Sequence, residues 1–315
     1  MFKILFVLIS ITYLNANAFT ERPFSDETLT IGYRVNQSEQ RKISKQICRL
    51  FKKEYTTIKC ETKGYLSSES ITADLNKGKI QFGLLRGNFA IRQSNLNTVV
   101  SLYDEYLTVI SKDNRINTLS ELKDTKVGIF SGVRGVVYDV IQHEKGKNVD
   151  LNIEFFNSYS DVEYALYNNE IYAFITTTAH PNQKIYNLIK KGYKLNTIDS
   201  YAVNNMIEKY KYYHEADIPK DMYYTEKSIN TVGIGIDFVT TANQQDKYVK
   251  MFLIAIFNNF PQFKLSNSAL LGFTPKDMFE RNTLPLHKES KAWVMKWKGG
   301  NMGNKKIKEP SLYLK

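Results

Sequence analysis

Short apolar strands alternate with amphipathic helices along most of this chain, and that alternation constrains the fold more than any other feature. Residues 29–34 (LTIGYR) are typical of a strand, and a helix follows in which apolar residues recur on one face from Ile43 to Phe51. Strands that alternate with helices of about 10 to 15 residues indicate parallel sheets built from βαβ units. The sequence therefore predicts an α/β protein.

The same pattern continues to residue 260. We expect further strands at 57–62, 80–86, 98–103, 106–112, 126–130, 151–156, 171–178 and 231–241, and helices at 67–78, 181–191 and 246–260. Thr118 with Glu121, and Ser160 with Glu163, have the spacing of capping boxes at helix starts. Pro181 suits the first turn of the helix that it begins.

The chain has too many predicted strands for one small sheet, yet no polar linker divides it into separate domains. A two-lobed protein fits better, in which residues 101–112 cross from one lobe to the other and residues 230–241 cross back. We expect residues 19–105 and 230–315 to form lobe one, residues 106–229 to form lobe two, and a cleft to lie between them.

The first eighteen residues have the pattern of a secretory signal peptide. Lys3 precedes an apolar run from Ile4 to Leu14, and Ala16-Asn17-Ala18 has the A-x-A form of a cleavage site. The run is too short to span a bilayer, which takes about 20 residues. We expect cleavage after Ala18 and export to the periplasm.

Cys48 and Cys60, the only cysteines, enter an oxidising compartment on this interpretation. Cys48 lies late in a predicted helix, and Cys60 lies in the strand that follows. A disulfide between them and two separately buried thiols are both compatible with the sequence. Their spacing matches no metal motif.

The formal net charge of +11 is spread along the chain among acidic residues, which indicates a solvated basic surface and no nucleic-acid partner. The sequence contains no zinc-protease, serine-hydrolase or Walker motif, and its four histidines have no metal-binding spacing. We therefore expect no catalysis, cofactor or metal. Residues 233–238 (GIGIDF) begin like a dinucleotide loop but lie within a strand. We interpret the tyrosine-rich residues 209–219 as a surface packing feature, and the alternative is that their aromatic rings line a pocket.

Polar side chains gather where four predicted strands end, and ligands of open α/β sheets bind at that edge. Arg34, Asn36, Arg86, Asn88, Ser131, Arg134, Thr178 and His180 are the candidates. Three arginine-bearing loops suit a small anion, because guanidinium groups match carboxylate geometry, and the turn at Ser131-Gly132 adds backbone N–H groups. The alternatives are solvated arginines and a structural role for His180.

Taken together, these segments resemble the TAXI-type solute receptors of TRAP transporters, a branch of the periplasmic binding proteins. The resemblance covers nearly the whole mature chain. It rests on six segments in the family's order: LTIGY (29–33), TKGYLSSESITADLNKGKIQFGLLRGN (62–88), SLYDEYLTVISK with INTLSELKDTKVGIFSGVRG (101–135), YAFITTTAHPNQKI (172–185), ADIPKDMYY (216–224) and LPLHKES (284–290).

The resemblance implies a two-lobed type II periplasmic binding protein fold, in which two mostly parallel sheets with flanking helices enclose a ligand cleft. It adds Ser67 and Ser68 to the site, and it ranks Arg134 first among the arginines because the Ser-Gly pair precedes it. This chain departs from the family at residues 33–36, where side chains replace glycines, at Ser70 and at Asn88. Ligand identity therefore stays open.

The function that the resemblance implies is capture of a small carboxylate, such as glutamate or a 2-oxo acid, and its delivery to TRAP-type permease subunits. We expect a monomer. Two alternatives are a ligand-sensing receptor of the same fold with a signalling partner, and a secreted enzyme on the same scaffold.

Overall fold

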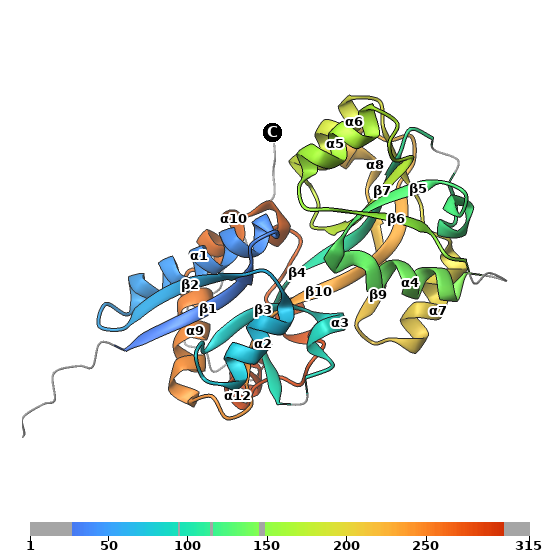
Figure 1. The fold of residues 1–315 in the computed structure, drawn as a ribbon. Helices are drawn as coiled ribbons and strands as arrows, with labels where there is room; N and C mark the ends of the chain where they lie inside the picture. Colours follow the sequence, from blue (N-terminus) through green and yellow to red (C-terminus); the bar gives the residue numbers. More distant parts are fainter. Residues whose placement is uncertain (1–26, 94, 114–115, 145–148, 299–315) are drawn as a thin grey trace, which may run out of the picture.

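The computed structural model describes residues 27–298 apart from 94, 114–115 and 145–148 (Figure 1). Its strands are β1 (Thr28–Arg34), β2 (Lys59–Tyr65), β3 (Phe82–Arg86), β4 (Leu96–Ser111), β5 (Lys126–Phe130), β6 (Asn152–Phe156), β7 (Ala173–Thr178), β8 (Lys194–Asn196), β9 (Tyr213–Ile218) and β10 (Ile229–Thr241). Its α-helices are α1 (Ser38–Glu54), α2 (Ser68–Asn76), α3 (Gly87–Ala90), α4 (Arg134–His143), α5 (Tyr159–Tyr167), α6 (Gln183–Lys190), α7 (Ser200–Lys209), α8 (Lys220–Tyr223), α9 (Asp246–Asn258), α10 (Phe260–Leu265), α11 (Asp277–Glu280) and α12 (Lys288–Lys298). Three short 3-10 helices are η1 (Leu119–Leu122), η2 (Ser131–Val133) and η3 (Ser268–Leu270).

The described strands form one continuous sheet in the order β2-β1-β3-β10-β4-β7-β5-β6, with β8 paired to β4 and β9 paired to β10. β1 is parallel to β2 and β3, and β5 is parallel to β6 and β7, as expected for βαβ units. β4 and β10 are long, antiparallel to each other, and run through both halves (Figure 1). The predicted α/β class is confirmed, and the two parallel halves are joined into one sheet by these two strands.

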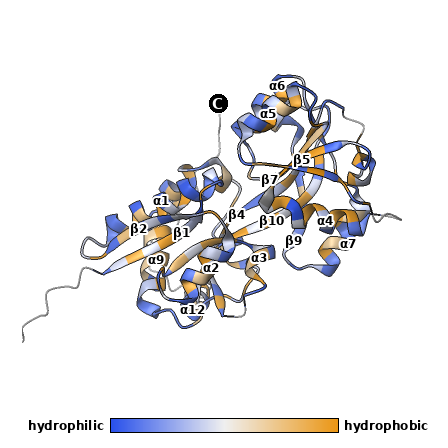
Figure 2. Ribbon diagram, in the orientation of Figure 1, coloured by the Kyte–Doolittle hydropathy of each residue, from blue (hydrophilic) through white to orange (hydrophobic). Residues whose placement is uncertain are grey.

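Separate apolar cores lie in the two halves, here named lobe one (around β1–β3) and lobe two (around β5–β7). In lobe one, Phe252 of α9 packs against Phe51 of α1 and against Phe82 and Phe238 on the sheet, with ring centroids 4.5 to 5.4 Å apart. In lobe two, α4 and α7 cover β5 and β7. Figure 2 shows the apolar residues along the interior strands and the polar ones on the outer faces of the helices. The residue boundaries that we predict for the lobes stay a prediction.

β4 corrects the expectation of two strands at 98–103 and 106–112. Asp104 and Glu105, taken as a break between them, lie buried within one strand. Asp104 Oδ2 is 3.0 Å from Arg281 Nη1, and Glu105 Oε2 is 2.6 Å from Arg86 Nη2. Since each carboxylate has an ionic partner from a distant part of the chain, the strand can continue through the charges.

Of three helix starts predicted from the sequence, the structure confirms one and places the other two at different residues. Thr118 and Glu121 form the predicted capping box at η1. The box predicted at Ser160 is wrong, because Ser158 caps α5 and accepts a hydrogen bond from the backbone N–H of Asp161. α6 begins at Gln183 and not at Pro181, since the Asn182 side chain caps it.

The tyrosine-rich segment 209–219 is a surface feature only in part, because Lys211, Glu215 and Asp217 are exposed while Tyr213 and Ile218 are buried. It contains β9, which pairs with β10. Tyr213 is buried, and its hydroxyl donates to Asp139 Oδ2 at 2.6 Å. The dismissed dinucleotide-like segment lies within β10 as predicted.

Cys48 of α1 and Cys60 of β2 form a disulfide, with Cα atoms 5.2 Å apart. α1 packs back along β1 and β2, and this brings its second half next to the strand. The disulfide alternative is therefore the one that the structure bears out.

The predicted signal peptide lies outside the described residues. Within them, we find no helix with the length and apolar character needed to cross a bilayer.

Candidate functional site

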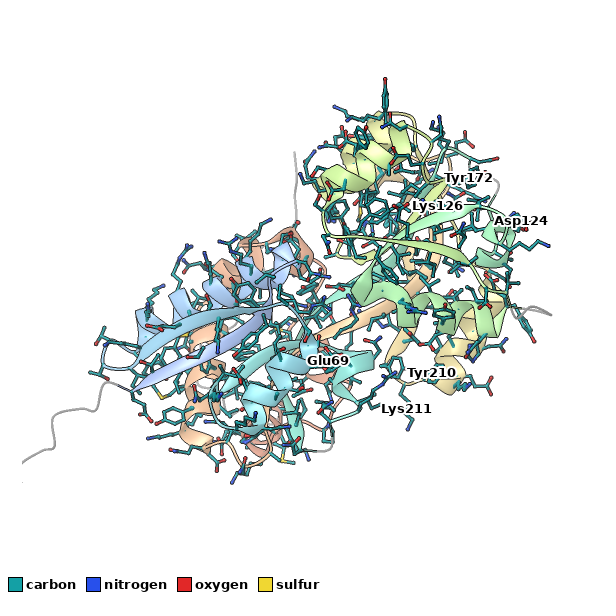
Figure 3. All side chains as sticks on the ribbon, viewed as in Figure 1. Glu69, Asp124, Lys126, Tyr172, Tyr210 and Lys211 are labelled. Atoms are coloured by element: carbon teal, nitrogen blue, oxygen red, sulfur yellow. A yellow bond between two sulfur atoms is a disulfide. The ribbon has the colours of Figure 1, made fainter. Side chains whose placement is uncertain are left out.

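A cavity of about 330 Å³ lies where the loops after β1, β2 and β3 of lobe one face η2 and α4 of lobe two. This is the edge of the sheet that the sequence singles out, and ligands of α/β sheets bind there. Figure 3 shows Glu69, one of the lining residues, on the flank of lobe one that faces lobe two. The cavity is lined by Arg34, Gln40, Leu66, Ser67, Ser68, Glu69, Arg86, Asn88, Phe89, Arg92, Gly132 and Gly135.

Local hydrogen bonds hold the lobe-one loops in place around this cavity. Ser67 caps α2, and its hydroxyl accepts from the backbone N–H of Ser70 at 3.2 Å. The backbone N–H of Arg34 donates to Gln40 Oε1 at 3.1 Å, which ties the end of β1 to the first turn of α1. The walls of the cavity on lobe one are therefore fixed by the helix starts.

Arg86 is buried and fully engaged. Its Nε and Nη2 donate to Glu105 Oε2 at 3.1 and 2.6 Å, and its Nη1 donates to the carbonyl oxygen of Gly132 at 2.9 Å. Only 8% of the Arg86 side chain and 2% of that of Glu105 are exposed. The guanidinium therefore bridges the crossing strand β4 and lobe two, and its charge is offset by Glu105.

Arg34 and Arg92 both line the cavity without a carboxylate partner at bonding distance among the described residues, but Arg92 is exposed whereas Arg34 is half-buried. The Nε of Arg34 is buried and has no hydrogen-bond acceptor there. Burial, and then repulsion by Arg86, lower the pKa of Arg34, while Glu105 and Glu69 oppose that shift. A Cβ atom on Gly132 would lie 2.7 Å from Arg34 Nη1, so the guanidinium reaches the backbone of η2. An acceptor bound here would satisfy a donor that is otherwise buried without one.

Arg134, ranked first from the sequence, does not line the cavity. It is exposed, and its guanidinium lies 5.4 Å from the ring centre of Tyr138 and 5.8 Å from that of Phe155. The backbone of η2 faces the site, but the first residue of α4 points its side chain to the outer surface. Asn36 is likewise exposed and outside the cavity, and the side chain of Ser131 is not among those described.

His180 and Thr178 lie in lobe two but do not line the cavity either. The ring nitrogens of His180 are 2.7 Å from the Tyr223 hydroxyl and 2.9 Å from Thr108 Oγ1. Burial lowers the pKa of His180 to about 3. Asn182 Nδ2 donates to Thr178 Oγ1 at 2.7 Å. The geometry favours the structural alternative for His180, a neutral ring held between two hydroxyls.

Five of the ten candidates therefore meet in one cavity: Arg34, Ser67, Ser68, Arg86 and Asn88. Sequence reasoning missed three polar residues that line the cavity, Gln40, Glu69 and Arg92, the partner of Arg86, Glu105, and the apolar Leu66 and Phe89. Glu105 had a signal, since an acidic residue inside an apolar run needs a buried partner. Gln40, Glu69 and Arg92 carry no such signal in the sequence.

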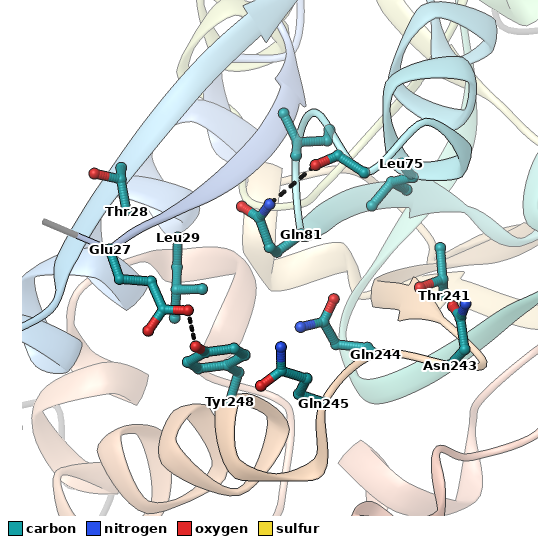
Figure 4. Close-up of a pocket in the computed structure, with 12 residues that line it drawn as sticks. Glu27, Thr28, Leu29, Leu75, Gln81, Thr241, Asn243, Gln244, Gln245 and Tyr248 are labelled. Atoms are coloured by element: carbon teal, nitrogen blue, oxygen red, sulfur yellow. Dashed lines mark hydrogen bonds between the residues drawn. The ribbon is translucent and has the colours of Figure 1, made fainter. Parts of the chain in front are cut away.

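A second cavity, also about 330 Å³, lies at the opposite end of β1, near the start of the strand. Figure 4 shows that its polar side chains bond to other parts of its own wall: Gln81 Nε2 donates to the Gly78 carbonyl at 3.2 Å, and the Tyr248 hydroxyl donates to Glu27. Its lining among the described residues contains no lysine or arginine that could bind an anion, and all of it belongs to lobe one. The interlobe cavity is therefore the better candidate.

No cluster of three metal-binding side chains occurs among the described residues. The polar groups of the interlobe cavity are guanidinium, hydroxyl and amide donors, with Glu69 as an exposed carboxylate at its rim. Such a set suits an oxyanion and offers little to a cation.

Comparison with known proteins agrees with this architecture. The model of the NMT1-like family matches residues 42–292. The periplasmic aliphatic sulphonate binding protein SsuA from Escherichia coli is similar in structure at 15% identity, with a TM-score of 0.50, over 89% of this chain and 95% of that one. XAC2383 from Xanthomonas citri, bound to ATP, is similar at 9% identity, with a TM-score of 0.53, over 87% of this chain and 98% of that one. No curated protein sequence matches the chain. These likenesses confirm the two-lobed periplasmic binding protein fold.

Proposed function

Because this chain belongs to the NMT1-like family and has the fold of solute-binding proteins, we propose that it is an exported receptor for a small anionic solute. The observation that carries the proposal is Arg34, a half-buried residue whose buried Nε has no acceptor, in a cavity shared by both lobes. A ligand oxyanion would give this donor its acceptor and would offset the positive charge of Arg34.

Binding is proposed to work by closure of the lobes. A ligand that contacts Arg34 on lobe one and the backbone of Gly132 and Gly135 on lobe two stabilises the closed arrangement by its contacts with both sides. No bond is made or broken in this mechanism, and we propose no enzymatic activity.

The ligand class that we propose is a small carboxylate, such as glutamate or a 2-oxo acid. Arg34 would bind the carboxylate, and the hydroxyl of Ser67 and the amide of Asn88 would bind other oxygens. Leu66 and Phe89 provide an apolar part of the wall. Glu69, at the rim, is the group that could pair with an ammonium if the ligand is an amino acid.

We propose a TRAP-type permease as the partner, with the mature chain acting as a periplasmic monomer after cleavage at Ala18. The alternative is a sensor of the same fold, and a secreted enzyme is the third reading. Genes for membrane transport subunits beside this one would favour the first proposal, and a histidine kinase gene would favour the second.

The first experiment is native mass spectrometry of the exported protein, followed by melting curves with a panel of organic acids, amino acids and sulfonates. A bound solute raises the melting temperature by mass action. If no anion co-purifies and none shifts the curve, the receptor proposal fails.

Calorimetry then tests the role of Arg34. Arg34→Ala should weaken binding by about 2 to 5 kcal/mol, because it leaves a desolvated anion unpaired, and Arg34→Lys should recover only part of the loss. Arg134→Ala is the matched control, since it removes the same charge from the outer face of η2–α4. An equal loss in both variants would show that the effect is general charge and not a contact in the cavity.

A further inference from the structure

A basic groove lies on the outer face of lobe one, between α1 and α10. Its volume is about 690 Å³, and its walls are Lys42, Lys45 and Arg49 on α1, and Gln262, Leu265 and Ser266 on and after α10. None of these residues lines the interlobe cavity. The groove is therefore a feature separate from the proposed solute site.

Side-chain bonds fasten the two walls of the groove at both ends. At one end, Lys53 Nζ is 2.6 Å from Asn259 Oδ1, and Asn259 Nδ2 donates to Glu54 at 2.8 Å. At the other end, Asn267 Nδ2 donates to Glu39 Oε2 at 2.5 Å. The spacing between α1 and α10 is thus set by the fold, and the groove is preformed.

Most of the positive charge that faces the groove has no acidic counterpart. Lys45 has no ion pair among the described residues, and Arg49 Nη1 bonds only to the neutral Gln46 Oε1 at 3.0 Å. Lys42 pairs with Glu39, which also accepts from Asn267. The spacing from Lys42 to Lys45 to Arg49 places the three cations on one side of α1. Leu265 stands beside them with 64% of its surface exposed.

Two occupants from the chain itself are excluded by charge. A second copy would bring another positive groove and a net charge of +11 toward the first. The C-terminal residues 299–315 contain four lysines and one glutamate, so they are basic as well. A flat lipid surface fits a concave site poorly, whereas a polypeptide segment can enter it.

We propose that this groove is a docking site for an acidic, amphipathic segment of a partner protein. Carboxylates spaced along one face of the segment would lie opposite Lys45 and Arg49, and one apolar side chain would cover Leu265. Exposed ion pairs are weak one by one, so binding should be weak and should fall as the salt concentration rises.

The test uses a fluorescein-labelled helical peptide that presents glutamates and one leucine on a single face, and a second peptide with glutamine in place of each glutamate. Fluorescence anisotropy at low and at physiological salt measures both. We expect the glutamate peptide to bind at least about tenfold more tightly at low salt, because only that peptide complements the cations. A glutamate peptide that does not bind refutes the proposal.

Two double variants locate the site. Lys45→Gln/Arg49→Gln should weaken binding about tenfold or more, while Lys184→Gln/Lys211→Gln, which removes two exposed lysines of lobe two, should change it less than about twofold. Leu265→Ser should weaken binding without a change in its salt dependence. Equal losses in the two double variants would show that binding depends on the net charge of the protein and not on this groove.

Binding to phosphatidylglycerol vesicles through Lys45 and Arg49, with no binding to the peptide, would assign the groove to lipid instead. Circular dichroism checks that each variant is folded.

Discussion

Replacing one partner of the Arg86–Glu105 pair should be far more damaging than replacing both. The two side chains are nearly inaccessible, and three donors of Arg86 are used, two by Glu105 and one by the carbonyl of Gly132. Arg86→Met leaves the carboxylate of Glu105 buried without its cation. Glu105→Leu leaves the guanidinium buried without its anion.

The expected sizes follow from the cost of an unpaired buried charge. Each single variant should lower the free energy of unfolding by about 3 to 5 kcal/mol. In Arg86→Met/Glu105→Leu no charge is left unpaired, and apolar side chains fill the space. The carbonyl of Gly132 loses its donor, which costs about 1 to 3 kcal/mol if it stays buried. The double variant should therefore lie within about 3 kcal/mol of the wild type, well short of the sum of the singles.

The assay is urea unfolding of all four proteins, followed by circular dichroism under non-reducing conditions and analysed as a double-mutant cycle. Equal slopes with denaturant would show that the unfolded states are comparable. If the double variant loses as much stability as the two single variants together, the pair is not coupled, and the bridge has no energetic importance. Small-angle scattering of the double variant should also show a less compact particle, since the bond from lobe one to Gly132 is gone.

Two further predictions concern stability. Cys48→Ala/Cys60→Ala should lower the free energy of unfolding by about 3 kcal/mol, as expected for a disulfide that closes so short a loop, and thiol titration of the unfolded, unreduced wild type should find no free thiol. The folded-state pKa of His180, about 3, lies below its ordinary value of 6.5, so the unfolded state binds the proton more tightly. Stability should be fully present above pH 6.5 and should fall as the pH drops from 6.5 toward 3. His180→Gln should flatten this dependence.

The order of strands and helices was predictable because it follows from apolar spacing. β1, β3, β5 and β7 are buried segments between helices with one apolar face, and these patterns are local. The continuity of β4 was not predictable in this way. Asp104 and Glu105 look like a break, and the residues that neutralise them come from positions 281 and 86.

For the site, the meeting of the loops was predictable, but the direction of each side chain was not. Carboxyl ends of parallel strands share an edge, so Arg34, Ser67 and Arg86 had to lie near one another. Whether the side chain of Arg134 faces the cavity depends on its place in the first turn of α4 and on the aromatic rings that it contacts. Arg134 lies over Tyr138, four residues further along the same helix, and over Phe155 of β6, and the contact with Phe155 leaves no local signal in the sequence.

The position of β10 between β3 and β4 bears on the order in which the molecule can assemble. β3 and β4 are consecutive along the chain, yet each pairs with β10 and they do not pair with each other. The sheet of lobe one is therefore left without its central strand until residue 241 has been made. If the chain is exported unfolded, all of its strands are already across the membrane when β10 pairs with β3 and β4. Pairing within β1–β3 and within β5–β7 does not involve β10, so we expect these two parallel sets to form before β10 joins them into one sheet.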